Sequence, residues 1–320
     1  MKLLQPAALT LPKEIKQVGL FNRSLPDRGQ GFLNVIEGIL TGESIAADKE
    51  AARECLYGLA SGLNNGPRFT AVIISDADLR GSGRRQFPEF LDWEVVDEFC
   101  SRYRVDALIA LEIFDSNTAL RESSADVERV VDKKKIKVKE YYVDALMNVN
   151  SGFTIYQPEG RKINDRNLFT DEMSWRGTGD SKDQALARLP SKRRALNQAA
   201  AFAGDQYARR ISPAWITDSR EFYRKANDDF KEAAKWVKRD QWEKAIIIWK
   251  KYTKDQDPKI AGRANYNMAV ASEVEGNLSL AEEWARRAWS EYGLKKAKNY
   301  IPILQTRQYE LDRLKQQMDD

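Results

Sequence analysis

The stretch 104–115, RVDALIALEIFD, decides the fold of the N-terminal part of the chain. It is short and apolar at nearly every position, which is typical of a strand that is covered on both faces of a sheet. The residues before it, 93–103, repeat apolar side chains every three or four positions and predict an amphipathic helix. This helix and this strand form half of a predicted α/β sandwich.

Upstream, the sequence predicts strands over 15–22 and 68–75 and a helix over 44–63, which ends at the breakers NNGP. The glycine-rich stretch 23–42 is predicted as a loop with one helical turn around 33–40. The order strand, helix, strand, helix, strand predicts a sheet with helical crossovers. Such crossovers are right-handed in nearly all proteins.

Downstream, a polar stretch at 116–126 separates the central strand from a predicted hairpin at 127–156, in which Gly152 marks a bulge. Residues 164–176 add one more strand. From 182 to 210 the apolar period is helical, with an interruption at Pro190. We therefore predict an α/β sandwich domain with a mixed sheet over residues 1–212.

The C-terminal part, residues 213–320, carries helical repeats, and from Arg220 onward it has no strand signal. Ala233 and Ala245 recur as Ala269 and Ala281, 36 residues later. That period is close to the roughly 34 residues of a tetratricopeptide unit, and residues 301–318 fit a capping helix. The sequence thus predicts an α+β chain whose second domain is an all-α stack of tetratricopeptide-like repeats.

The composition argues against several kinds of function. Lys and Arg number 52 against 48 Asp and Glu, so the net charge of +4 gives no reason to expect a nucleic-acid partner. The chain has no histidine, which removes the usual general base and metal ligand. We predict no enzymatic activity, no cofactor and no metal site, and only carboxylate chemistry stays formally open.

Two cysteines, Cys55 and Cys100, lie on the apolar stripes of predicted helices. They are interpreted either as two buried thiols or as a disulfide between two helices on the same face of the sheet. The sequence contains no apolar run of the length that a membrane span requires.

Several local patterns could bind ligands. Gly81 to Arg85, GSGRR, could cradle a phosphate, and Asp76 with Asp78 could hold a cation, but a surface loop and a helix-leading turn are favoured. The lysine-rich run 132–139 could meet anionic lipids or glycans, but a solvated turn that protects a sheet edge is favoured. In the repeats, side chains predicted to contact a protein partner are Trp236, Trp242, Arg263 and Asn267.

Several segments carry a resemblance to a known family: LPKEI at 11–15, NRS at 22–24, LEIFDS at 111–116 and GDQYARRISP at 204–213. With the helical repeats that follow, they resemble a family of uncharacterised Bacteroidetes envelope lipoproteins. This resemblance implies export, a periplasmic or outer-membrane location, and an acylated cysteine just before Met1. The N-terminal lipid anchor would then lie outside this sequence.

These observations lead to two hypotheses about function. The first is a non-catalytic, lipid-anchored adaptor that binds a protein partner of the cell envelope through its helical repeats. The alternative is a binding module for cell-wall or glycan fragments, which would use the loops at 76–87 and 115–122. Exposed aromatic rings beside a cleft would favour the second hypothesis.

Overall fold

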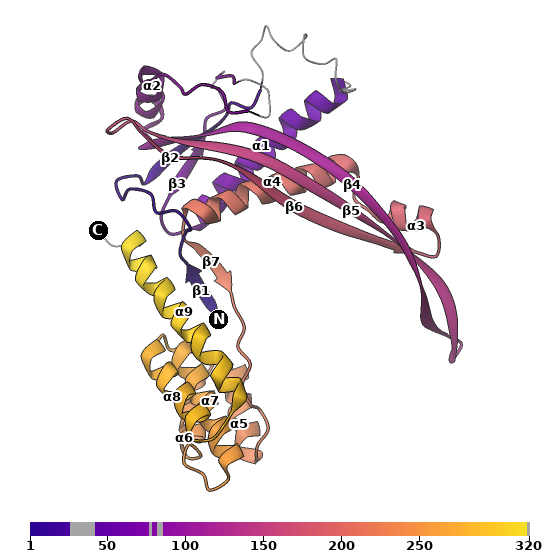
Figure 1. The fold of residues 1–320 in the computed structure, drawn as a ribbon, viewed down its shortest axis with the longest axis vertical. Helices are drawn as coiled ribbons and strands as arrows, with labels where there is room; N and C mark the ends of the chain where they lie inside the picture. The colour runs from indigo at the N-terminus through magenta and orange to yellow at the C-terminus, as the bar shows by residue number, and fades with distance from the viewer. Residues whose placement is uncertain (26–41, 77–78, 82–85, 319–320) are drawn as a thin grey trace. The chain divides into compact units, whose positions relative to one another are not determined.

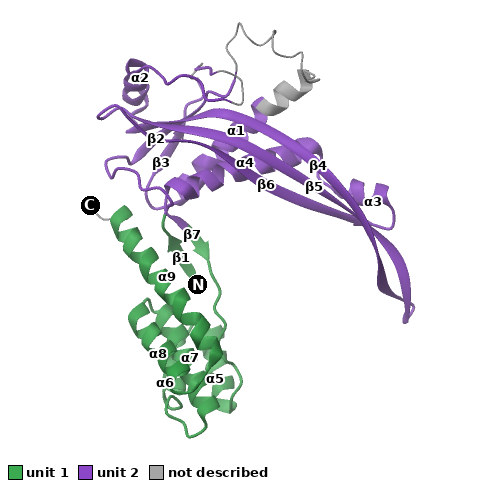
Figure 2. Cartoon of the chain, viewed as in Figure 1, with its two compact units in different colours: residues 1–6, 215–320 green, residues 7–214 purple. Residues whose placement is uncertain are grey.

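The computed structural model describes residues 1–25, 42–76, 79–81 and 86–318, with side chains from Lys49 onward in the first helix. The chain divides into two compact units (Figure 2). The sheet unit is Ala7–Ala214, and the helical unit combines Met1–Pro6 with Trp215–Asp320. The first six residues, which were predicted as part of the sheet domain, belong to the helical unit, in which β1 (Lys2–Gln5) pairs with β7 (Ala214–Thr217).

The sheet unit contains a five-stranded mixed sheet in the order β3-β2-β4-β5-β6, which confirms the predicted fold class (Figure 1). Its strands are β2 (Gln17–Asn22), β3 (Thr70–Ile73), β4 (Ala107–Val131), β5 (Lys134–Gln157) and β6 (Lys162–Gly179). Strand β2 runs parallel to both of its neighbours, β3 and β4, whereas β5 is antiparallel to both β4 and β6.

The polar stretch at 116–126 is not a break between strands, as the sequence suggested, but the middle of β4. Its backbone pairs continuously with β5 until the tight turn at Asp132 and Lys133, whose φ angles of 50° and 64° suit a two-residue hairpin. Most of these side chains face solvent, so the strand needs no apolar pattern there. The partner strand supplies the hydrogen bonds that keep it extended.

The predicted bulge lies on the facing strand, at Glu112 and not at Gly152, because the register shifts between Leu111 and Ile113. Gly152 is still required, since a Cβ there would lie 2.9 Å from the Cβ of Ile113. The bulged Glu112 is fully buried. Its carboxylate accepts from Arg23 Nη1 at 2.8 Å, from Tyr156 at 2.7 Å and from Thr154 at 2.6 Å.

Helices cover both faces of the sheet (Figure 1). One core contains α1 (Gly42–Asn65) and α4 (Lys192–Ile211), and the core on the opposite face contains α2 (Trp93–Tyr103). The predicted interruption near Pro190 is confirmed, because α3 (Lys182–Ala187) ends before it. The helices α1 and α4 meet closely through glycine: a Cβ on Gly204 would lie 1.9 Å from the Cys55 carbonyl oxygen.

Cys55 and Cys100 are free, buried thiols, so the disulfide alternative is wrong. They belong to the two different cores, on opposite faces of the sheet. Burial raises the pKa of both thiols, that of Cys100 to about 12.

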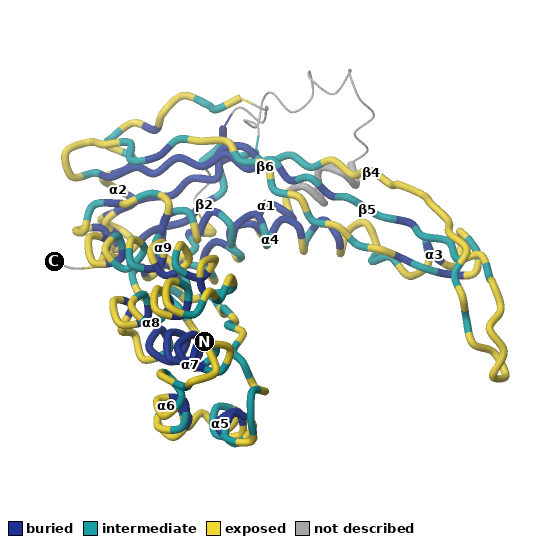
Figure 3. The backbone as a smooth tube through the Cα atoms, turned by 60° about the horizontal axis from the view of Figure 1, so that its bottom comes forward, coloured by how far each residue is buried: buried dark blue, intermediate teal, exposed yellow. Residues whose placement is uncertain are grey.

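The helical unit consists of α5 (Asp228–Lys238), α6 (Trp242–Lys250), α7 (Pro258–Val274), α8 (Leu278–Ser290) and α9 (Lys295–Met318). The four alanines of the predicted repeat are fully buried, which lets successive helices approach closely. Figure 3 shows that α7 is buried along most of its length. Within the described part of the chain, no helix has both the length and the apolar character that a membrane span needs.

Candidate functional site

Helix α7 lies at the centre of the helical unit, and one of the segments that pack against it is not a helix. Residues 219–226 form neither helix nor strand and run against α7. We call these residues the docked segment. The side chains of α7 that hold it form a candidate site for an extended polypeptide.

The first kind of contact is hydrogen bonding to the main chain of the docked segment. Asn267 is fully buried, and its Oδ1 accepts from the Tyr223 backbone N–H at 2.7 Å. Its Nδ2 donates to the Tyr223 carbonyl at 2.8 Å, and Arg263 donates to the Lys225 carbonyl at 3.0 Å. Because these bonds reach backbone atoms, they do not depend on which side chain the extended segment carries.

The second kind of contact is a buried ion pair. Arg220 donates from Nε and Nη2 to the two carboxylate oxygens of Glu273, at 2.8 Å each. The Glu273 side chain is 1% exposed, and Tyr300 also donates to it. Burial lowers the pKa of Arg220, but the hydrogen bonds to Glu273 and Asp218 outweigh that effect and raise it, so the guanidinium stays charged.

Aromatic side chains complete the contact. The Phe222 ring lies 6.1 Å from the Trp242 ring and 5.8 Å from the Trp249 ring. The ring of Tyr223 meets Tyr266 edge to face at 5.5 Å. Both aromatic residues of the docked segment pack against the two apolar clusters of the helical core.

Three of the four residues predicted to bind a partner therefore contact the docked segment. Trp242 contacts Phe222, and Arg263 and Asn267 bind the main chain of the segment. Asn267 has no exposed surface, because it is used within the chain. The fourth, Trp236, is half-buried beneath the ammonium of Lys244, 4.2 Å from its ring centroid. Sequence reasoning missed Glu273, whose signal was a carboxylate on an otherwise apolar helix face.

The other patterns noted in the sequence do not assemble a site. Residues 82–85 of the proposed phosphate loop and Asp78 lie outside the described residues. Asp76 accepts a hydrogen bond from Tyr103, and that bond lowers the pKa of its carboxyl. Across the ranges that the structure describes, no three carboxylate or cysteine side chains are arranged to hold a metal ion.

The lysine-rich run forms the tip of the β4–β5 hairpin. Lys137 faces Glu128 across the strands, Lys139 faces Asp126, and the Lys135 ammonium lies 3.2 Å from the Glu128 carboxylate. These acidic neighbours offset the positive charge of the run.

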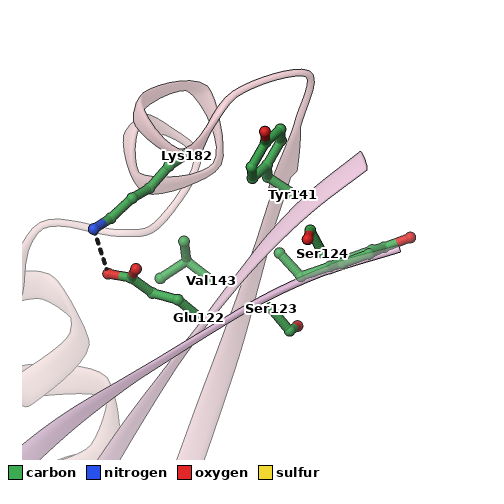
Figure 4. Close-up of a pocket in the computed structure, with 7 residues that line it drawn as sticks. Glu122, Ser123, Ser124, Tyr141, Val143 and Lys182 are labelled. Atoms are coloured by element: carbon green, nitrogen blue, oxygen red, sulfur yellow. Dashed lines mark ion pairs between the residues drawn. The ribbon is translucent and has the colours of Figure 1, made fainter. Parts of the chain in front are cut away.

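A small pocket of about 260 Å³ lies farther along this hairpin, beside α3 (Figure 4). Lys182 points across it to Glu122, and their charged atoms are 2.8 Å apart. This ion pair neutralises both charges. The remaining lining groups, among them Ser124 and Tyr141, supply hydroxyls but no charge for a ligand.

Two family models match this chain, and both describe domains of unknown function. Residues 231–309 match a domain of unknown function, DUF6340. Among solved structures, one described as a neuraminyllactose-binding hemagglutinin homologue from Helicobacter pylori is 16% identical, with a TM-score of 0.27, over 64% of this chain and 87% of that one. No curated protein matches. Residues 15–223 match the domain of unknown function DUF8603, and the chain therefore belongs to that family.

Proposed function

We propose that the protein is a non-catalytic adaptor whose helical unit binds an extended segment of a protein partner along α7. The observation that supports this proposal is the docked segment itself. It is held through its backbone by Asn267 and Arg263, and through one arginine by Glu273. A second chain with an arginine two residues before an aromatic residue meets the same requirements.

In the isolated chain, residues 219–226 compete with such a partner. A covalently tethered segment has an effective concentration of about millimolar, so a free peptide must exchange with it. The extended conformation and the absence of helical or sheet hydrogen bonds in the segment favour exchange. Partner binding is then coupled to release of the chain's own segment.

A fluorescent peptide with the sequence of residues 216–227 tests this proposal on the full chain. The Arg220→Ala/Phe222→Ala substitutions weaken the binding of the tethered segment to α7. We therefore expect the peptide to bind this variant at least tenfold more tightly than it binds the unaltered protein. Adding Asn267→Leu to the variant removes both hydrogen bonds to the Tyr223 backbone, and we expect it to abolish binding. Ile247→Ala, at a 62% exposed position of α6, serves as the control that leaves peptide binding unchanged.

Two results would contradict the proposal. One is a peptide that fails to bind the weakened variant while circular dichroism shows its helices intact. The other is a peptide that binds equally well when Asn267 is replaced.

We also propose, from the family resemblance, that the natural protein is exported and anchored by a lipid in the cell envelope. The partner would then be an envelope protein. Crosslinking in intact cells, with the full-length protein and its export segment, tests this location. We expect one dominant envelope protein attached to lysines of the helical unit, whereas crosslinks confined to the chain itself would count against the adaptor.

A further inference from the structure

The sheet unit has a second candidate site, set by the topology of its parallel strands. From β2 the chain continues to α1 on one face, and from β3 it continues to α2 on the other. The connections after two neighbouring strands thus leave the sheet in opposite directions. In open α/β sheets this arrangement opens a crevice outside the carboxyl ends of those strands, where ligands bind.

A cleft of about 570 Å³ lies at this position, a size typical of small-molecule sites. It is lined by Asn22 at the end of β2, by Ile73 and Asp76 at the end of β3, and by one side of α1. The buried Leu56 and Ile74 give the cleft an apolar floor. Its walls are polar, so the cleft can both cover and orient a ligand.

The α1 wall carries two cations, of which Arg53 acts electrostatically on Glu50 of the same wall. Lys49 and Arg53 are exposed, four residues apart on the helix, and within the described residues neither side chain forms an ion pair or a hydrogen bond. The nearby Glu50 is occupied, because Arg193 and Asn197 both donate to its carboxylate, the latter at 2.7 Å. These two cations can hold a carboxylate of a ligand.

One helical turn further, Tyr57 lines the same cleft and is 48% exposed. Its ring offers a flat apolar face beside the cations. Across the cleft, the Asp76 carboxylate offers acceptors for hydroxyl groups, whereas the Asn22 oxygen already accepts from Ser24 and leaves the amide N–H₂ as a donor. An aromatic face, hydroxyl acceptors and a pair of cations together match a sugar ring that carries a carboxylate.

From this geometry we propose that the cleft between the ends of β2 and β3 binds an acidic saccharide, with its carboxylate on Lys49 and Arg53 and its ring against Tyr57. This site gives the alternative hypothesis of a glycan-binding module a definite position. It is separate from the α7 site and does not depend on the adaptor proposal.

The test measures binding of D-glucuronic and D-galacturonic acid by saturation-transfer NMR, with D-glucose and inorganic phosphate as comparison ligands. We expect binding of an acidic sugar and at least tenfold weaker binding in the Lys49→Gln/Arg53→Gln variant. Tyr57→Ala weakens binding, whereas Tyr57→Phe retains it. The matched control is Lys13→Gln/Lys16→Gln, which removes the same charge from exposed positions just before β2.

Three results would overturn the proposal: glucose that binds as tightly as the acidic sugars, phosphate that binds while the sugar acids do not, or no binding of either sugar acid. Equal losses in the cleft variant and in the control variant would also overturn it, because they would indicate a general charge effect.

Discussion

Replacement of Glu273 by glutamine tests whether the docked segment is held by the buried ion pair. The substitution keeps the size of the side chain but removes its charge from a position where it is 1% exposed. Arg220, which is 13% exposed, then retains only the more exposed Asp218 as an acidic partner. Removing one partner of a buried ion pair lowers the free energy of unfolding by about 3–5 kcal/mol. Because Asp218 still pairs with Arg220, we expect a smaller loss here, of about 2–3 kcal/mol.

The assay is urea unfolding followed by tryptophan fluorescence, because most of the tryptophans belong to the helical unit. A double-mutant cycle with Arg220→Met separates the interaction energy between Arg220 and Glu273 from the effect of replacing each side chain alone. We expect a coupling energy of about 2 kcal/mol. A coupling below about 0.5 kcal/mol, the value of an exposed pair, would refute the reasoning that the segment is anchored here.

Three further predictions concern the sheet unit. Glu112→Gln should lower its unfolding free energy by about 3 kcal/mol, because Arg23 loses its buried counter-charge; an unchanged urea midpoint would contradict this. Cys55 and Cys100 should resist a thiol reagent at pH 8 until urea is added, since burial raises the pKa of both. The hydrogen bond from Arg176 lowers the pKa of Asp144 below its usual 3.8. The urea midpoint should therefore be constant above about pH 4 and fall below that pH as the Asp144 carboxylate protonates.

The sequence alone determined the elements whose apolar residues repeat with a clear period. The strand around Ala107 to Leu111 and the helix before it follow from local pattern, because core-facing residues must return with the period of the backbone. The same holds for the helices of the C-terminal part, where small residues recur at a fixed spacing. Burial of both cysteines also followed from their place on apolar stripes.

Only the tertiary structure decided the features that depend on partners distant in the chain. The polar residues 116–126 form a strand because β5 pairs with them, and a polar exposed strand has no apolar signal of its own. Asn267 and Glu273 are of polar residue types that usually lie at the surface, yet they are buried because Tyr223 and Arg220 satisfy their polar atoms. Likewise, the cations at the cleft become a candidate site only through the order of the parallel strands, since strand order is set by packing and pairing across the whole sheet.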